Sequence, residues 1–358
     1  MKIILYIFIG IILVSISSCA GDNNSRNVVE PTETTTVRSD LLRSRKSCYA
    51  MYHWKTEFNP TDEEWGMMRR HSVSRLYVKM FDVVYDSDFD CEIVPIATTT
   101  FKQKPQDGVE IVPCVYITVD AMRRIYAEML SEKVADLIIN RVLNMVDYNE
   151  LGEVKEIQFD CDWTASTRDN FFALCEAAKN MLEKKGIALS VTIRLHQLSQ
   201  SCPPAHSGML MLYNTGALKS SKTQNSILSY DDVELYLKNN TYKLPLDFAY
   251  PAFSWFVWFR GDDFQALISE VDVSNKVLYE NVRDNIYEVK KDHDCKGQQL
   301  RKGDILRYEA SDVDEVMRVK YAVERQIKNS NYSVAIYHLS SKDIKKISED
   351  EINNIYDK

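Results

Sequence analysis

The sequence predicts an α/β fold, a (β/α)8 barrel of the TIM type with an insert between its seventh and eighth strands. Eight extended apolar runs begin after Cys48, and most are continuous instead of alternating, which is typical of strands covered on both faces. Helical patterns separate most of these runs, and such alternation predicts a parallel sheet. The eight runs are 49–54, 74–84, 109–118, 156–163, 187–195, 208–214, 244–253 and 333–339.

The predicted helices have recognisable starts and stops. Thr61 and Glu64 form a capping-box pattern that opens one helix, and Gly186 is a favourable residue just after the end of another. The expected helices are 61–73, 120–146, 167–185, 229–238 and 312–328.

Two segments depart from a regular barrel. Residues 91–101 read as extended where a helix would be expected, and 285–309 read as a β-hairpin within an insert at about 260–330. An open doubly wound sheet is the alternative architecture. It is disfavoured because no glycine-rich phosphate loop follows any strand.

The first 19 residues predict an export signal. Lys2 precedes an apolar stretch, and Ile16-Ser-Ser-Cys19 resembles a bacterial lipobox, which implies lipidation of Cys19. A plain signal peptide with an incidental cysteine is the alternative. Residues 20–47 are polar enough for a flexible tether, the barrel is expected over 48–340, and 341–358 should form a helical tail. We expect the protein to be exported and anchored as a lipoprotein in the outer membrane, on the periplasmic side or at the cell surface.

Composition excludes some partners and cofactors. A net charge of −8 argues against nucleic acid. The cysteines show no C-x-x-C spacing, so we expect no metal, no other cofactor and no disulfide framework, although one disulfide remains open. The expected partners are a glycan or oligosaccharide and, through the lipid anchor, a membrane.

Asp160 and Asp162 are the candidate catalytic residues. Functional groups of such barrels gather at the carboxyl ends of the strands, and two residues separated by one position face the same way, about 6.7 Å apart. Two such carboxylates should couple, with one pKa raised. The alternative is neutralisation by Arg194 or Lys79 in a buried polar layer.

Aromatic and polar residues at the other strand ends complete the candidate site. Acids combined with aromatic rings suit sugars, because sugar C–H faces stack on rings while carboxylates bind hydroxyls or transfer protons. Core packing is the alternative for the tryptophans, and a structural hydrogen bond is the alternative for the histidine. The candidate substrate-binding residues are His53, Trp54, Asp82, Trp163, Arg194, Tyr213, Asn214 and Tyr250.

The fourth and sixth runs resemble the chitinase-like family 18 glycoside hydrolases. Asp160-Cys-Asp162-Trp-Thr164 corresponds to the family's Asp-x-Asp-x-Glu, and Met211-Leu-Tyr213-Asn214 to its Met-x-Tyr-Asp. The resemblance implies that Asp162 orients an N-acetyl group and that Tyr213 and Asn214 position it. The family's general acid would stand at Thr164, whose hydroxyl cannot supply a proton at neutral pH.

Nearly the whole chain also resembles a group of uncharacterised bacterial barrel proteins, often lipoproteins. Two hypotheses follow. The first is a glycoside-hydrolase-like lipoprotein acting on a glycan, and an acid from another strand, such as Asp82 or Asp247, would favour it. The second is a catalytically inactive glycan-binding or scaffold lipoprotein on the same barrel, which Thr164 favours.

Overall fold

The computed structural model describes residues 47–357 apart from 87–91, 126–128, 239–241 and 328–330. The predictions for the signal segment, for Cys19 and for most of the tether lie outside the described residues. No helix in the described part of the chain is long and apolar enough to span a bilayer.

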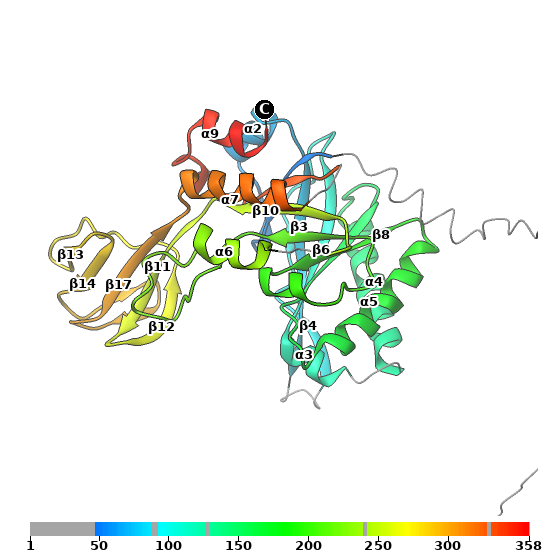
Figure 1. The fold of residues 1–358 in the computed structure, drawn as a ribbon, viewed down its shortest axis with the longest axis horizontal. Coiled ribbons are helices and arrows are strands. Elements are labelled where there is room, and N and C mark those ends of the chain that lie inside the picture. The colour runs from blue at the N-terminus through cyan, green and yellow to red at the C-terminus, as the bar shows by residue number, and fades with distance from the viewer. Residues whose placement is uncertain (1–46, 87–91, 126–128, 239–241, 328–330, 358) are drawn as a thin grey trace, which may run out of the picture.

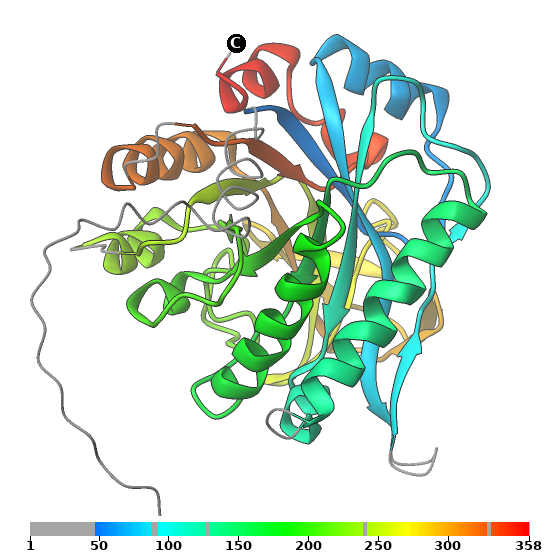
Figure 2. The same ribbon diagram turned by 90° about the vertical axis from the view of Figure 1, so that its right-hand side faces the viewer.

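A closed parallel barrel forms the body of the molecule, which confirms the predicted fold class (Figures 1 and 2). Strand β1 pairs in parallel with both β3 and β18, and this pairing closes the ring. The short strand β4 (Glu92–Ile96) adds antiparallel to β3, as the extended reading of 91–101 predicted. The barrel strands are β1 (Tyr49–His53), β3 (Val73–Asp86), β6 (Glu110–Ile117), β7 (Glu156–Asp160), β8 (Ala188–Ile193), β9 (Ser207–Met211), β10 (Leu246–Pro251) and β18 (Val334–Tyr337).

Helices surround the barrel, and most begin where the sequence predicts. The Thr61 hydroxyl accepts from the Glu64 amide while Glu64 bonds back to Thr61, so the capping box is present. The single helix expected over 120–146 is instead two helices, because Ile125 adopts an extended conformation at the end of the first. The helices are α2 (Asp62–Arg70), α3 (Val119–Arg124), α4 (Met129–Tyr148), α5 (Arg168–Glu183), α6 (Tyr230–Leu237) and α7 (Val313–Gln326).

The crossover from β8 to β9 is thinner than the others. It contains the short 3₁₀ helix η1 (Leu195–Ser199) where neighbouring crossovers have α-helices. This difference leaves a cavity between η1 and α6.

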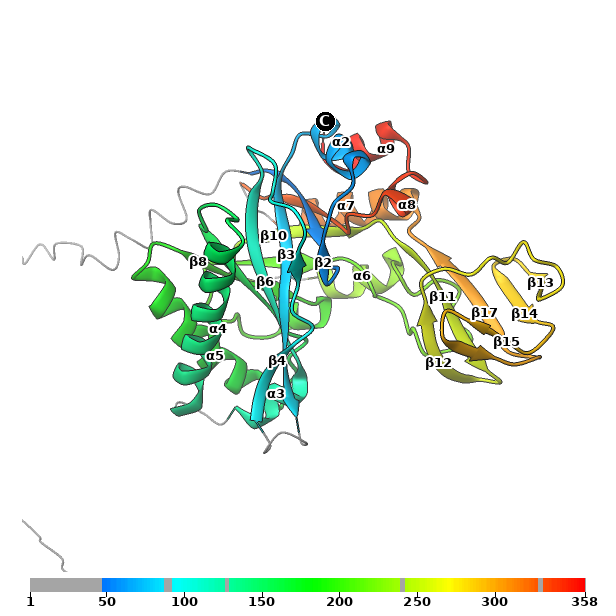
Figure 3. The same cartoon turned by 180° about the vertical axis from the view of Figure 1, so that it is seen from behind.

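A second, antiparallel sheet lies between β10 and β18 and projects to one side of the barrel (Figures 1 and 3). It begins at Ser254, earlier than the expected 260, because Phe256 and Trp258 point into a core of its own together with Leu306. It is also larger than the expected hairpin. Its strands are β11 (Ser254–Arg260), β12 (Asp263–Ile268), β13 (Tyr279–Arg283), β14 (Ile286–Val289) and β17 (Ile305–Ala310), with β15 (His293–Cys295) and β16 (Gln298–Leu300) as a small ribbon beside them.

The C-terminal segment contains two short helices, α8 (Ser341–Ile344) and α9 (Glu349–Ile355). Ile352, Ile355 and Tyr356 are buried, and the Tyr356 hydroxyl donates to the carbonyl of Ala50 in β1. The segment therefore packs onto the barrel. A pair of two-residue strands, β2 (Glu57–Phe58) and β5 (Thr100–Phe101), completes the fold.

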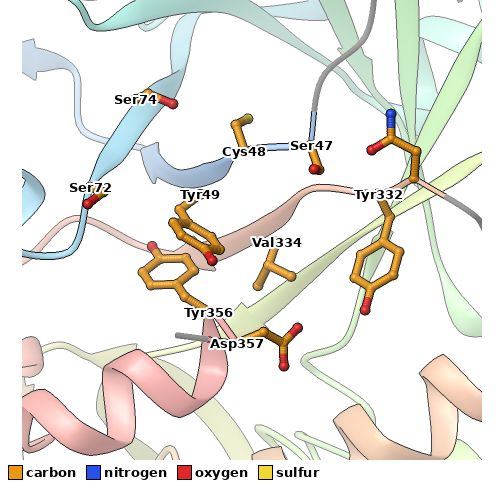
Figure 4. A pocket seen from close by; sticks show the side chains of 10 residues that line it. Ser47, Cys48, Tyr49, Ser72, Ser74, Tyr332, Val334, Tyr356 and Asp357 are labelled. Atoms are coloured by element: carbon orange, nitrogen blue, oxygen red, sulfur yellow. The ribbon is translucent and has the colours of Figure 1, made fainter.

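A cavity of about 500 Å³ opens beside the start of β1, at the amino ends of the strands (Figure 4). Tyr49, Tyr332 and Tyr356 surround it together with Cys48 and Asp357. Burial raises the pKa of the Cys48 thiol, so the cysteine stays protonated at neutral pH.

Candidate functional site

The register of the barrel brings polar side chains to one level near its carboxyl end. Asp82 of β3 is opposite Tyr116 of β6, and Tyr116 is opposite Asp160 of β7. From β8, the Thr192 hydroxyl donates to Asp160 Oδ1 over 2.6 Å. Four neighbouring strands thus contribute to one mouth, as the barrel hypothesis predicts.

Arg194 connects the two predicted catalytic acids. Its Nε donates to Asp162 Oδ1, and its Nη2 lies 3.8 Å from Asp160 Oδ1. The Asp160 side chain is 7% exposed, whereas that of Asp162 is 43% exposed. Burial raises the pKa of Asp160, and the Arg194 charge acts in the opposite direction. Only Asp162 of this pair is open to a ligand.

Asp82, the first candidate for an acid from another strand, is also paired. Lys79 Nζ lies 2.8 Å from Asp82 Oδ1 and donates to Oδ2 over 2.9 Å. The other acid considered, Asp247, is fully buried and accepts a hydrogen bond from the Ser333 amide, which precedes β18. Neither is an unpaired acid at the mouth.

Aromatic rings form a layered wall of the mouth. Tyr213 stacks on Tyr337 with ring centroids 4.6 Å apart, and Phe253 meets both rings edge-on. Trp54 lies 6.2 Å from Tyr337, and Trp255 lies 4.9 Å from Phe253. Trp54, Trp255 and Tyr337 are only partly buried, so their rings are accessible for stacking.

A cavity of about 280 Å³ lies between Asp162 and Tyr213, the member of the aromatic wall that lines it. Asn214 follows β9 with a φ of 55°, a left-handed conformation that asparagine tolerates better than most residues. The cavity is lined by Asp162, Arg194, Leu195, His196, Met211, Tyr213, Asn214, Thr215 and Tyr236.

Three of the predicted site residues are buried away from the mouth. Trp163 is fully buried against Phe171 and Phe172 of α5, because it faces the opposite way from Asp162. Tyr250 is likewise fully buried, and Glu324 of α7 is among the nearest charges to its hydroxyl. His53 is buried and packs on Phe58 outside the strand ring.

Thr164 does not replace the acid of the family motif. Its hydroxyl lies 3.0 Å from that of Ser166, and its backbone N–H donates to the Thr167 hydroxyl. These contacts belong to the turn that precedes α5, so Thr164 has a structural role there.

The sequence suggested Lys79 as a partner of Asp160 or Asp162, whereas Lys79 pairs with Asp82. Four rings at the mouth were not selected as site residues, namely Tyr116, Phe253, Trp255 and Tyr337. Tyr337 and Trp255 end or follow predicted strands, so the sequence could predict their position near the mouth. It could not predict their exposure, because exposure depends on neighbours from other strands.

The second sheet fixes the loop that follows β9. Arg307 Nε donates to Glu309 Oε1 over 2.7 Å, and both side chains are at most 1% exposed. Arg307 also donates to the carbonyls of Ser220 and Leu218. Glu309 Oε2 accepts from the Ser226 hydroxyl and from Trp255 Nε1. One buried ion pair therefore holds both the loop and a mouth tryptophan.

His53 should make the protein acid-sensitive. Burial lowers its pKa from 6.5 to about 4, so the folded protein binds fewer protons than the unfolded chain between these values. The stabilisation is complete above pH 6.5 and is lost as the pH falls toward 4, by about 3 kcal/mol. In His53→Phe, urea unfolding should depend less on pH across this window, because phenylalanine does not take up a proton. The substitution breaks no hydrogen bond of Nδ1, which has no partner. The same substitution at the exposed His196 is the control, and equal pH slopes in both variants would refute this account.

The ring of eight parallel strands and the mouth at their carboxyl ends define the class by fold: the chain has a (β/α)8 barrel of the TIM type. Among solved structures it is similar to the chitinase from Chromobacterium violaceum ATCC 12472, with 11% identity, 86% of this chain and 98% of that chain covered, and a TM-score of 0.51. It is also similar to the C-terminal domain of a putative chitinase from Desulfitobacterium hafniense DCB-2, with 6% identity, coverages of 87% and 98%, and a TM-score of 0.51.

A third similar structure is the Group IV chitinase of Ostrinia furnacalis in complex with allosamidin, with 10% identity, coverages of 87% and 98%, and a TM-score of 0.50. No family model and no curated protein sequence matches the chain. At such low identities these similarities establish the fold.

Proposed function

We propose that this protein binds a glycan at the barrel mouth and does not hydrolyse it. The observation that carries the proposal is the position of Arg194, which is ion-paired with both Asp160 and Asp162. A general acid must be protonated and within reach of the glycosidic oxygen. Asp162 is accessible but held by a cation, whereas Asp160 is buried.

The mouth has the groups that sugar binding needs. Asp162 and Arg194 can bind hydroxyl or acetamido groups, and the partly exposed Trp54 and Tyr337 offer ring faces. The fold that the chain shares with chitinase structures supports a glycan as the ligand class.

A glycan array tests the proposal. Wild type should retain a defined set of oligosaccharides, and Tyr213→Ala should reduce their affinity at least tenfold, because it removes the ring stacked on Tyr337 and beneath Arg194. Tyr148→Ala, on the outer surface of α4, is the matched control because that ring is 88% exposed. Failure of wild type to bind any glycan would refute the proposal.

A glycoside hydrolase is the second candidate, and the raised pKa of Asp160 favours it. If Arg194 moved with Asp162 on substrate binding, a protonated Asp160 could act as the acid. Release of product by wild type but not by Asp162→Asn would favour this candidate over the first.

We further propose export and membrane anchoring through Cys19, on the strength of the Ile16-Ser-Ser-Cys19 tetrad. Radiolabelled palmitate should enter the full-length chain in a bacterial host and should not enter Cys19→Ala. Equal labelling of both chains would exclude this anchor.

A further inference from the structure

A second cavity extends the mouth down the outside of the barrel. It has a volume of about 570 Å³ and lies between the segment 198–202, which begins in η1, and the carboxyl end of α6. Tyr236 lines both this cavity and the one at the mouth, so the two are adjacent. The groove exists because the β8–β9 crossover has the short η1 in place of an α-helix.

The groove has the side chains that a sugar chain would need, with apolar and aromatic surface on one side and hydrogen-bonding groups on the other. Tyr236 is 42% exposed and Leu235 is 68% exposed, and both lie on the α6 side. The opposite side offers the hydroxyls of Ser199 and Ser201 and the amide of Gln200. Aromatic, hydroxyl and amide groups facing one another resemble the mouth itself.

The groove differs from the mouth in charge. Lys238 and Lys243 line it, and no acid is among the described residues that line it. Lys238 lies 3.9 Å from Glu234, but both side chains are exposed, so this contact neutralises the lysine weakly. On a protein of net charge −8, two lysines in a groove are a local reversal of sign.

We propose that this groove is a second subsite for a carboxylate-bearing sugar, so that the glycan bound at the mouth is an acidic oligosaccharide. The inference rests on the proposed function, because the same chain would occupy both cavities. The two lysines would pair with the sugar carboxylate while Tyr236 stacks at the junction.

Matched tetrasaccharides test the subsite by titration calorimetry at low salt. Three neutral backbones are compared with their acidic forms: chitotetraose with and without lactyl carboxylates on alternate sugars, tetragalacturonate methyl-esterified or free, and a lactosamine tetrasaccharide with and without terminal sialic acid. At least one acidic form should bind about five- to tenfold more tightly than its neutral partner, with the difference shrinking at high salt.

The double variant Lys238→Gln/Lys243→Gln should lose this preference and keep its affinity for the neutral form. The control Lys104→Gln/Lys155→Gln makes the same charge change at exposed lysines that line neither cavity. Equal binding of neutral and acidic forms, or a preference that persists in the groove variant, would overturn the subsite and leave glycan binding at the mouth intact. Binding of none of the six sugars would also overturn the subsite, whereas the proposed function falls only if wild type binds no glycan on the array.

Discussion

Arg194→Met should lower the free energy of unfolding by about 3 kcal/mol at neutral pH and remove glycan binding. The reason is that the buried Asp160 would lose the cation that offsets its burial. The variant's Asp160 pKa should rise further, so the loss of stability is largest above that pKa and shrinks as the pH falls and the carboxyl takes up a proton. Urea unfolding at several pH values measures this effect.

Two further variants make the interpretation specific. Asp160→Asn added to Arg194→Met should restore most of the stability, because it removes the unpaired buried charge. Arg168→Met is the matched control, since Arg168 pairs with the exposed Asp169 and should change stability by less than about 1 kcal/mol. If Arg194→Met proved as mild as Arg168→Met, the central ion pair would not have the role assigned to it.

Glu309→Gln should destabilise the protein by about 3 kcal/mol and loosen the loop over 214–229. The side chain accepts from Arg307, Ser226 and Trp255, and glutamine would leave the buried Arg307 charge uncompensated. Backbone hydrogen exchange in 214–229 should increase, and the fluorescence of Trp255 should shift.

Glu270→Gln provides the comparison, because it makes the same change in the segment between β10 and β18. Glu270 pairs with Lys296 and Lys342, but all three side chains are about half exposed. Its effect on stability should be below about 1 kcal/mol, with hydrogen exchange of the loop unchanged. Equal exchange in Glu309→Gln and wild type would show that the second sheet does not hold the loop.

The barrel was predictable because its strands are buried on both faces. Continuous apolar runs such as 109–118 are typical of strands that are covered on both faces. Eight such runs predicted a closed ring of eight strands. The start of the second sheet was harder to locate. Phe253 and Phe256 lie close together in the sequence and differ little in composition, yet they pack in different cores.

The site was only partly predictable for a similar reason. The strand-end rule located Asp160, Asp162, Arg194 and Tyr213 correctly at the mouth. It could not separate Trp163 from Asp162, because the direction of a side chain after a strand ends depends on the following turn. Arg194 comes from the segment after the neighbouring strand β8, so the sequence alone could not choose between a free and a paired carboxylate at Asp160 and Asp162.

Recovery of a bound oligosaccharide tests the central claim most directly. A ligand identified on the array would be incubated at stoichiometric concentration with wild type and with Asp162→Asn, released by denaturation, and analysed by mass spectrometry. The ion pairs of Arg194 with Asp160 and Asp162 predict that wild type returns the oligosaccharide at its original length. Shortened products from wild type, absent with Asp162→Asn, would contradict the account and establish a hydrolase.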